Sequence, residues 1–161
     1  MRYVYYFDDE ITNESVQELI DIISQVEQVD LFVTTIGGSK WAIEVLMHAI
    51  NQHPDINIYL TGYIASAGTF FLTECEQPVY LHPSLEWILF HKGDRPVEGE
   101  FRKNTLDRHI LYDNLNKDND ELGLKYKKLG LTSKEMKLYN DGHDVVVYKK
   151  DFHRLKIARQ E

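Results

Sequence analysis

Strand-like and helix-like patterns alternate from the start of the chain, and this alternation limits the possible fold more than any other feature. Aromatic and aliphatic residues fill positions 3–7, 31–33 and 56–60, as is typical of strands. Between these runs, apolar residues recur with a helical period at residues 16–26 and 41–50. A connection that contains a helix is long enough to join parallel strands. The pattern therefore predicts an α/β fold.

Shorter elements are expected farther along the chain. A short buried helix is predicted to begin at Ser66, and apolar runs predict strands at residues 79–81 and 87–90. The segment 132–135, Thr-Ser-Lys-Glu, is a capping box that opens another short helix. A last apolar run, at residues 145–147, is expected to be a buried strand.

A long helical segment follows the strand that ends near residue 90. Its middle, residues 116–121, is wholly polar, and Gly123 weakens a helix by about 1 kcal/mol relative to alanine. The helix is therefore expected to project from the body or to break in this window. We expect one domain over residues 1–161, with a core in residues 1–98 and 130–161 and a helical arm at about residues 99–129.

Composition excludes several classes of protein. A formal net charge of -8 disfavours a nucleic-acid partner. The single cysteine, Cys75, cannot form an internal disulfide, and its neighbours Glu74 and Glu76 disfavour a reactive thiolate. No apolar run resembles a signal peptide or reaches the length of a membrane span. We expect a soluble cytoplasmic protein without a membrane partner.

Ser66 is the first candidate for chemistry. A serine among small residues is most often a packing or capping residue. Ser66, however, follows a strand and opens a helix, where free N–H groups and a positive dipole end are found. The small neighbours Ala65, Ala67 and Gly68 leave room for a substrate carbonyl. Ile64 stands where a G-x-S-x-G elbow has its first glycine, so this is a different nucleophile motif.

A base and an orienting carboxylate complete the minimum set for covalent acyl transfer. Most histidines are core or surface residues, but His91 ends a strand just before a polar loop, where α/β folds place functional side chains. His143 is a weaker candidate for the base. Asp144 precedes the apolar run 145–147 and is expected to face inward, while Asp141 remains an alternative. No histidine or cysteine pair has convincing metal-ligand spacing, so neither a metal nor another cofactor is expected.

The glycine pair Gly37-Gly38 ends the second predicted strand. Such a pair can be a simple turn, but glycine also lets the backbone approach a ligand without hindrance from a Cβ atom. With Ser39 next, the pair could open the following helix and expose N–H donors to an anion.

Three stretches, in order, resemble the proteolytic subunit of the Clp protease (ClpP), a serine peptidase family with a crotonase-like fold of repeated β-β-α units. They are residues 31–39, which contain the Gly-Gly-Ser loop, residues 62–72, which contain Ala-Ser-Ala-Gly, and residues 83–91, which end in Ile-Leu-Phe-His. The interval between Ser66 and His91 also matches the family, and the resemblance covers most of the chain.

The resemblance implies a role for each matching residue. Ser66 would be the nucleophile, His91 the general base and Asp144 the residue that orients the histidine. The N–H groups of Gly38 and Ala67 would form the oxyanion hole. Further substrate-binding residues would be Gly37, which shapes the glycine loop, and Lys92 and Gly93, in a segment at residues 92–97 that would lie beside an extended peptide.

The resemblance also implies an assembly. The helical arm is similar to the handle that joins two stacked heptameric rings, so we expect a homo-oligomer of one or two rings that acts on a peptide or an unfolded protein. An AAA+ unfoldase is the partner implied by the family, but nothing before residue 3 matches the family's axial loops, which argues against such docking. Two alternatives remain: a catalytically degenerate ring or regulatory subunit, and a crotonase-fold enzyme that acts on acyl-CoA.

Overall fold

The fold was taken from a computed structural model, which describes residues 1–93 and 105–157, and for residues 105–112 describes the helical backbone alone. The elements, in chain order, are β1 (Tyr3–Asp8), α1 (Asn13–Ile23), β2 (Val29–Thr35), α2 (Lys40–Gln52), β3 (Ile56–Ala65), η1 (Ser66–Thr69), α3 (Phe70–Thr73), β4 (Val79–Leu81), β5 (Trp87–Phe90), α4 (Thr105–Leu129), α5 (Ser133–Asn140), β6 (Val145–Tyr148) and η3 (Lys149–Arg154).

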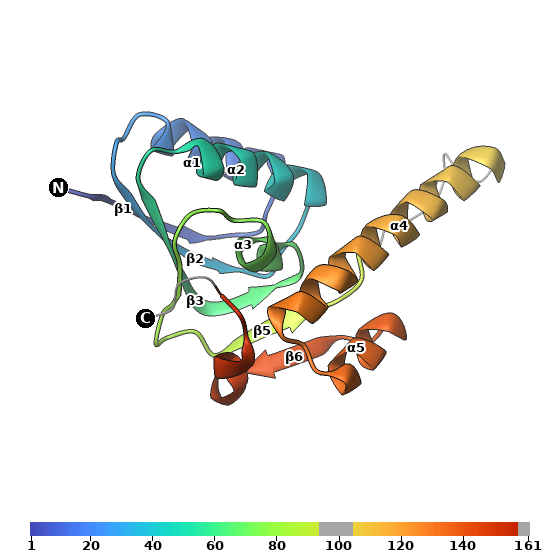
Figure 1. Cartoon of the computed structure of the whole chain (residues 1–161). Coiled ribbons are helices and arrows are strands. Elements are labelled where there is room, and N and C mark those ends of the chain that lie inside the picture. Colours follow the sequence, from blue (N-terminus) through green and yellow to red (C-terminus); the bar gives the residue numbers. More distant parts are fainter. Residues whose placement is uncertain (94–104, 158–161) are drawn as a thin grey trace.

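In the described part of the chain, the strands form one sheet in the order β1-β2-β3-β5-β6, with β4 paired to the first half of β3. All pairings are parallel except the one between β5 and β6. Helices α1 and α2 cover one face of β1, β2 and β3 (Figure 1). The predicted α/β architecture with parallel strands is therefore confirmed.

Local sequence signals explain these elements. Alternate residues of β2, beginning with Val29, are buried, so one face of the strand packs in the core. Helix α1 begins after Thr12, which exchanges hydrogen bonds with Ser15 in a capping box. Ser39 caps α2 by accepting from the Ala42 N–H.

Strand β3 is longer than its apolar pattern predicted and ends directly before Ser66. The short helix expected there begins as the 3₁₀ turn η1 and continues as α3. Thr69 is fully buried in η1, and its hydroxyl shares a 2.7 Å hydrogen bond with that of Tyr126 in α4. This contact joins the turn after β3 to the long helix.

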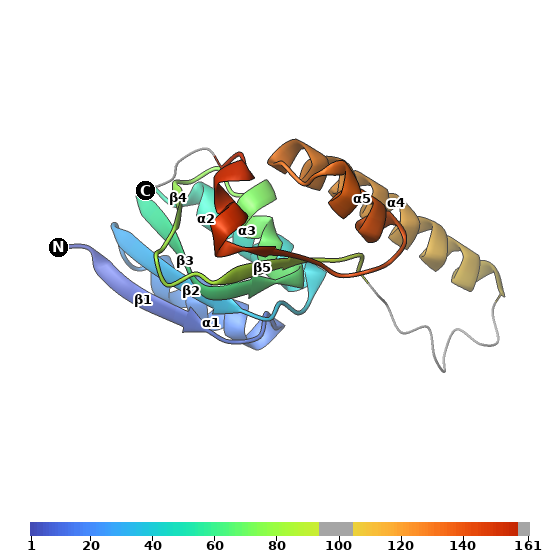
Figure 2. The same cartoon turned by 90° about the horizontal axis from the view of Figure 1, so that it is seen from below.

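Helix α4 is continuous through its polar window and extends away from the body (Figure 1). Within this window Asn119 is buried and accepts a hydrogen bond from the Gly93 N–H, so the helix packs a polar side chain there. Gly123 lets α5 pack closely, since a Cβ atom there would lie 2.9 Å from the Tyr139 ring. Figure 2 shows α4 and α5 side by side. Residues 99–104 of the expected arm lie outside the described residues.

The last elements of the chain complete one edge of the sheet. The expected capping box between Thr132 and Glu135 is present at the start of α5. Strand β6 then pairs antiparallel with β5. Among the described helices, none is both long and apolar enough to cross a membrane.

Candidate active site

The candidate residues meet at one edge of the sheet because of strand register. Parallel neighbouring strands end at the same edge, and an antiparallel neighbour begins there. Ser66 follows the last residue of β3, His91 follows the last residue of β5, and Asp144 precedes the first residue of β6. The residues that pair between neighbouring strands nearest this edge are Thr35 with Ile64, Ala65 with Leu89, and Phe90 with Val145.

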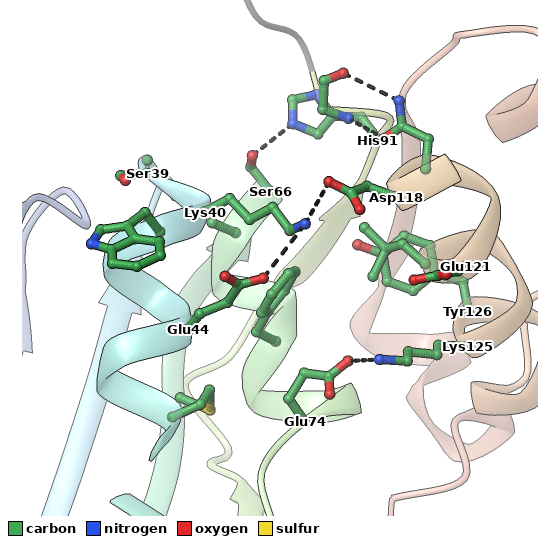
Figure 3. Close-up of a pocket in the computed structure, with 18 of the residues that line it drawn as sticks. Ser39, Lys40, Glu44, Ser66, Glu74, His91, Asp118, Glu121, Lys125 and Tyr126 are labelled. Carbon is green, nitrogen blue, oxygen red and sulfur yellow. Dashed lines mark hydrogen bonds and ion pairs between the residues drawn. The ribbon is translucent and has the colours of Figure 1, made fainter. Parts of the chain in front are cut away.

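Ser66 has a strained backbone and a hydrogen bond to His91. Its φ of 57° makes it the one non-glycine residue with a positive φ in the described chain. Such a conformation costs about 1–3 kcal/mol and persists where the surroundings enforce it, commonly at functional sites. The turn presents the Ser66 Oγ atom 2.6 Å from the Nε2 atom of His91 (Figure 3).

Asp144 contacts the other side of the imidazole more loosely. Its Oδ1 atom lies 3.5 Å from the His91 Nδ1 atom, whereas charge-assisted hydrogen bonds are about 2.7–2.9 Å long. The Asp144 side chain is 63% exposed, so the expectation that it faces inward is wrong. The physical reason is its place one residue before β6, outside the buried ladder that begins at Val145.

The alternative candidates lie elsewhere. Asp141 ends α5, and its N–H donates to the carbonyls of Lys137 and Tyr139. His143 is exposed, and its backbone N–H continues the same turn. Of the two aspartates, the structure brings Asp144 to His91.

The Gly37-Gly38 loop packs against the Ser66 turn. A Cβ atom at Gly37, whose φ is 97°, would lie 2.6 Å from the Ser66 Cβ atom, so this close approach requires glycine. The Gly37 N–H donates to the Thr35 hydroxyl, but within the described residues the Gly38 N–H donates no hydrogen bond. Ala67 lies in the first turn of η1, where N–H groups have no intrahelical acceptor. The edge thus offers two backbone donors near Ser66.

Lys92 and Gly93 contact other parts of this chain. The Lys92 ammonium donates to the Asn140 carbonyl at 2.9 Å, which ties the end of β5 to α5. The Gly93 N–H donates to the Asn119 side-chain oxygen at 2.9 Å, and the Asn119 amide donates back to the Gly93 carbonyl at 3.3 Å. Residues 94–97, the rest of the predicted peptide-binding segment, lie outside the described residues.

Asn119 is a residue that sequence reasoning missed. It is 7% exposed and fixes the chain two residues after His91. The pattern that could have identified Asn119 is helical spacing, since Asn119 follows Leu115 by four positions and precedes Tyr126 by seven, and so lies on the same helix face. A polar residue on the apolar stripe of a helix indicates a buried polar contact.

A groove of about 810 Å³ extends from Ser66 and His91 between α2, α3 and α4 (Figure 3). The Lys40 ammonium in α2 lies 2.8 Å from Asp118 in α4 and 3.5 Å from Glu44. Burial is the largest single influence on Lys40 and lowers its pKa, but the hydrogen bonds and negative charges of Asp118 and Glu44 together outweigh burial, so the pKa of Lys40 is raised. The apolar part of the groove lining includes Met47, Phe70, Leu115, Leu122 and Tyr126.

Cys75 stays protonated at neutral pH. Burial raises the pKa of its thiol to about 11, and the Glu76 carboxylate adds to the effect. Burial, rather than the neighbouring acids expected from the sequence, is the larger cause. Among the described residues, no group of three or more histidine, cysteine, aspartate or glutamate side chains is placed to hold a metal ion.

Comparison with known proteins identifies the fold. No protein-family model matches the chain, and no curated protein matches it. Among solved structures, a mutant of ClpP1 from Listeria monocytogenes superimposes with a TM-score of 0.72 and 14% sequence identity. The match covers 98% of this chain and 90% of that one. The fold predicted from the three motifs is thus confirmed.

Proposed function

We propose that this chain, which has the ClpP fold, is a serine endopeptidase with Ser66 as nucleophile and His91 as general base. The observation that carries the proposal is the 2.6 Å hydrogen bond between the Ser66 hydroxyl and the His91 imidazole. A nucleophile within hydrogen-bond reach of a base is the geometry that covalent catalysis requires. The positive φ of Ser66 supports the same role, because strain of this kind gathers at functional sites.

The proposed reaction has two halves. The Ser66 oxygen attacks a peptide carbonyl as its proton passes to His91, and His91 then gives this proton to the leaving amine. Water, deprotonated by His91, next attacks the acyl-enzyme, and Ser66 is released with its proton restored. The N–H groups of Gly38 and Ala67 would stabilise both oxyanions, and one such donor typically lowers the barrier by about 3 kcal/mol.

Asp144 is proposed as the third member of this set. A carboxylate beside Nδ1 stabilises the imidazolium and selects the tautomer whose Nε2 can accept the serine proton. At 3.5 Å and largely exposed, Asp144 contributes less than a buried, tightly bonded carboxylate would.

The substrate is proposed to be a peptide or an unfolded protein, and the assembly a cytoplasmic homo-oligomeric ring. The ClpP fold supports the ring, and the projecting α4 is similar to the handle expected from the sequence. Acyl-CoA hydration or isomerisation needs carboxylate acid–base groups at the reacting centre, whereas the two groups in hydrogen-bond contact at this edge are a hydroxyl and an imidazole. The described groups therefore favour the peptidase.

Labelling with a fluorophosphonate probe tests the proposal. We expect a covalent adduct on Ser66, and we expect Ser66→Ala to lose both the adduct and peptide cleavage while keeping its thermal stability. Ser84→Ala is the matched control, because the exposed Ser84 hydroxyl also lies 2.8 Å from a histidine, His82. The control should keep full labelling and activity.

A catalytically inactive ring subunit is the second candidate, and the long contact between His91 and Asp144 is what favours it. Absence of the Ser66 adduct in correctly assembled wild-type protein would decide for this candidate. An adduct that survives in Ser66→Ala would also overturn the peptidase proposal.

A further inference from the structure

The groove beside Ser66 carries an excess of negative charge. Its described lining has five acidic residues and only two lysines, Lys40 and Lys125. The acids come from three segments: Glu44 from α2, Glu74 and Glu76 from the turn after α3, and Asp118 and Glu121 from α4. An anionic substrate side chain would meet like charge here, whereas a cationic one would be attracted.

The part of the groove next to Ser66 already holds a cation of this chain. The Lys40 ammonium lies between Asp118 and Glu44, on the Ser66 side of Glu74 (Figure 3). Its side chain is 40% exposed, and ion pairs with this exposure contribute little to stability and are screened by solvent. A second cation of suitable shape can therefore replace Lys40 between the two carboxylates.

The apolar lining indicates which kind of cation would fit the groove. Met47, Phe70 and Leu122 line the groove together with the acids. Lysine and arginine combine an apolar stem with a charged end, so the stem can lie on this apolar surface while the charge reaches a carboxylate. A purely aliphatic side chain would use only the apolar part.

We propose that the groove binds a lysine or arginine side chain of the substrate, paired with Asp118 and Glu44, and that Lys40 is an internal competitor for these carboxylates. The inference rests on the proposed peptidase function. Because Ser66 attacks the carbonyl of the residue before the scissile bond, the side chain of that residue lies nearest the nucleophile and enters the groove beside it. The chain would therefore cleave after basic residues.

The test uses peptide-coumarin substrates that are identical except for the residue before the cleaved bond, which is arginine, norleucine or glutamate. For the assembled wild-type protein we expect kcat/KM to be about tenfold higher for arginine than for glutamate, with norleucine between them. Asp118→Asn should lower the arginine-to-norleucine ratio by about fivefold, the effect of one exposed charge pair. Lys40→Met, which keeps an apolar stem, should raise that ratio.

The two variants break the same ion pair but should move the ratio in opposite directions, which a merely structural role of the pair would not do. Asp113→Asn is the matched control, because Asp113 is an exposed acid on α4 outside the groove lining. It should leave the ratio unchanged.

Equal cleavage after arginine and glutamate would overturn the specificity. So would a shift of the ratio in the same direction in Asp118→Asn and Lys40→Met. In either case, fluorophosphonate labelling of Ser66 would leave the peptidase function standing. Absence of that labelling would overturn the peptidase function and the specificity together.

Discussion

The two sides of the groove are held in place by different forces. On the sheet side, Ser66 and His91 directly follow buried, paired strands, so backbone register determines their positions. On the α4 side, side chains join the helix to the core. These contacts are Lys40 with Asp118, Asn119 with Gly93, Lys125 with Glu74, and Tyr126 with Thr69.

This difference separates the geometry of the chemistry from the selection of the substrate. Register in a buried sheet is strongly specified, because a one-residue slip would turn buried side chains toward solvent. Side-chain pairs between a helix and the core can change one at a time without altering the sheet. The positions of the proposed nucleophile and base are therefore set by the sheet, whereas the α4 contacts can vary one at a time.

The sharpest way to break the sheet side is Gly37→Ala. The new Cβ atom would lie 2.6 Å from the Ser66 Cβ atom, at a φ of 97° that itself costs about 1–3 kcal/mol. We expect activity to fall by more than about a hundredfold through displacement of Ser66, together with a clear loss of stability in thermal unfolding. Gly142→Ala is the control for backbone strain alone, because its φ is 83° but no atom lies within 4 Å of the added Cβ. Equal activity losses in both variants would contradict the steric explanation.

The buried contact between α4 and η1 is expected to give the largest effect on the helix side. Thr69→Val should lower the free energy of unfolding by about 1–3 kcal/mol, because it leaves the buried Tyr126 hydroxyl without its partner. Tyr126→Phe should lower it by about 0.5–1.5 kcal/mol, because the Thr69 hydroxyl loses Tyr126 but keeps its hydrogen bond to the Ser66 carbonyl. In denaturant titrations the double variant should lose less than the sum of the two single variants. Strict additivity would show that the two hydroxyls do not interact.

Asp144→Asn tests how far strand register alone sets the third position. Loss of a buried, tightly bonded carboxylate from a catalytic set costs about 10⁴ in kcat. Because Asp144 is exposed and 3.5 Å from His91, we expect a smaller fall, about ten- to a hundredfold in kcat, with stability unchanged. Asp141→Asn serves as the control and should keep its activity. The reverse result would assign the role to Asp141.

The smallest effect is expected for Lys125→Met. Lys125 is next to Tyr126 on α4 but pairs with Glu74 at the surface, where both side chains are partly exposed. The free energy of unfolding should change by less than about 1 kcal/mol. A loss as large as that of Thr69→Val would show that exposed ion pairs, and not the buried hydroxyl pair, hold α4 on the core.

Several features of the site were predictable because their causes are local. Ser66 and His91 each end an apolar strand, and two strands with parallel crossovers must end at one edge. Gly37 was recognisable as a residue that allows close approach, although the atoms it approaches were not. The capping box at Thr132 was likewise readable, since donor and acceptor lie three residues apart.

The sequence by itself determined the order and approximate places of the helices and strands and which residues could carry chemistry, because caps and periodicity depend on neighbours within a few positions. Only the tertiary structure decided that Asp144 rather than Asp141 reaches His91, and that Asn119 braces Gly93. It alone brought Lys40 to Asp118, 78 positions away. Such pairs depend on how α4 packs against the core, and no local pattern encodes the partner of a polar side chain in a distant element.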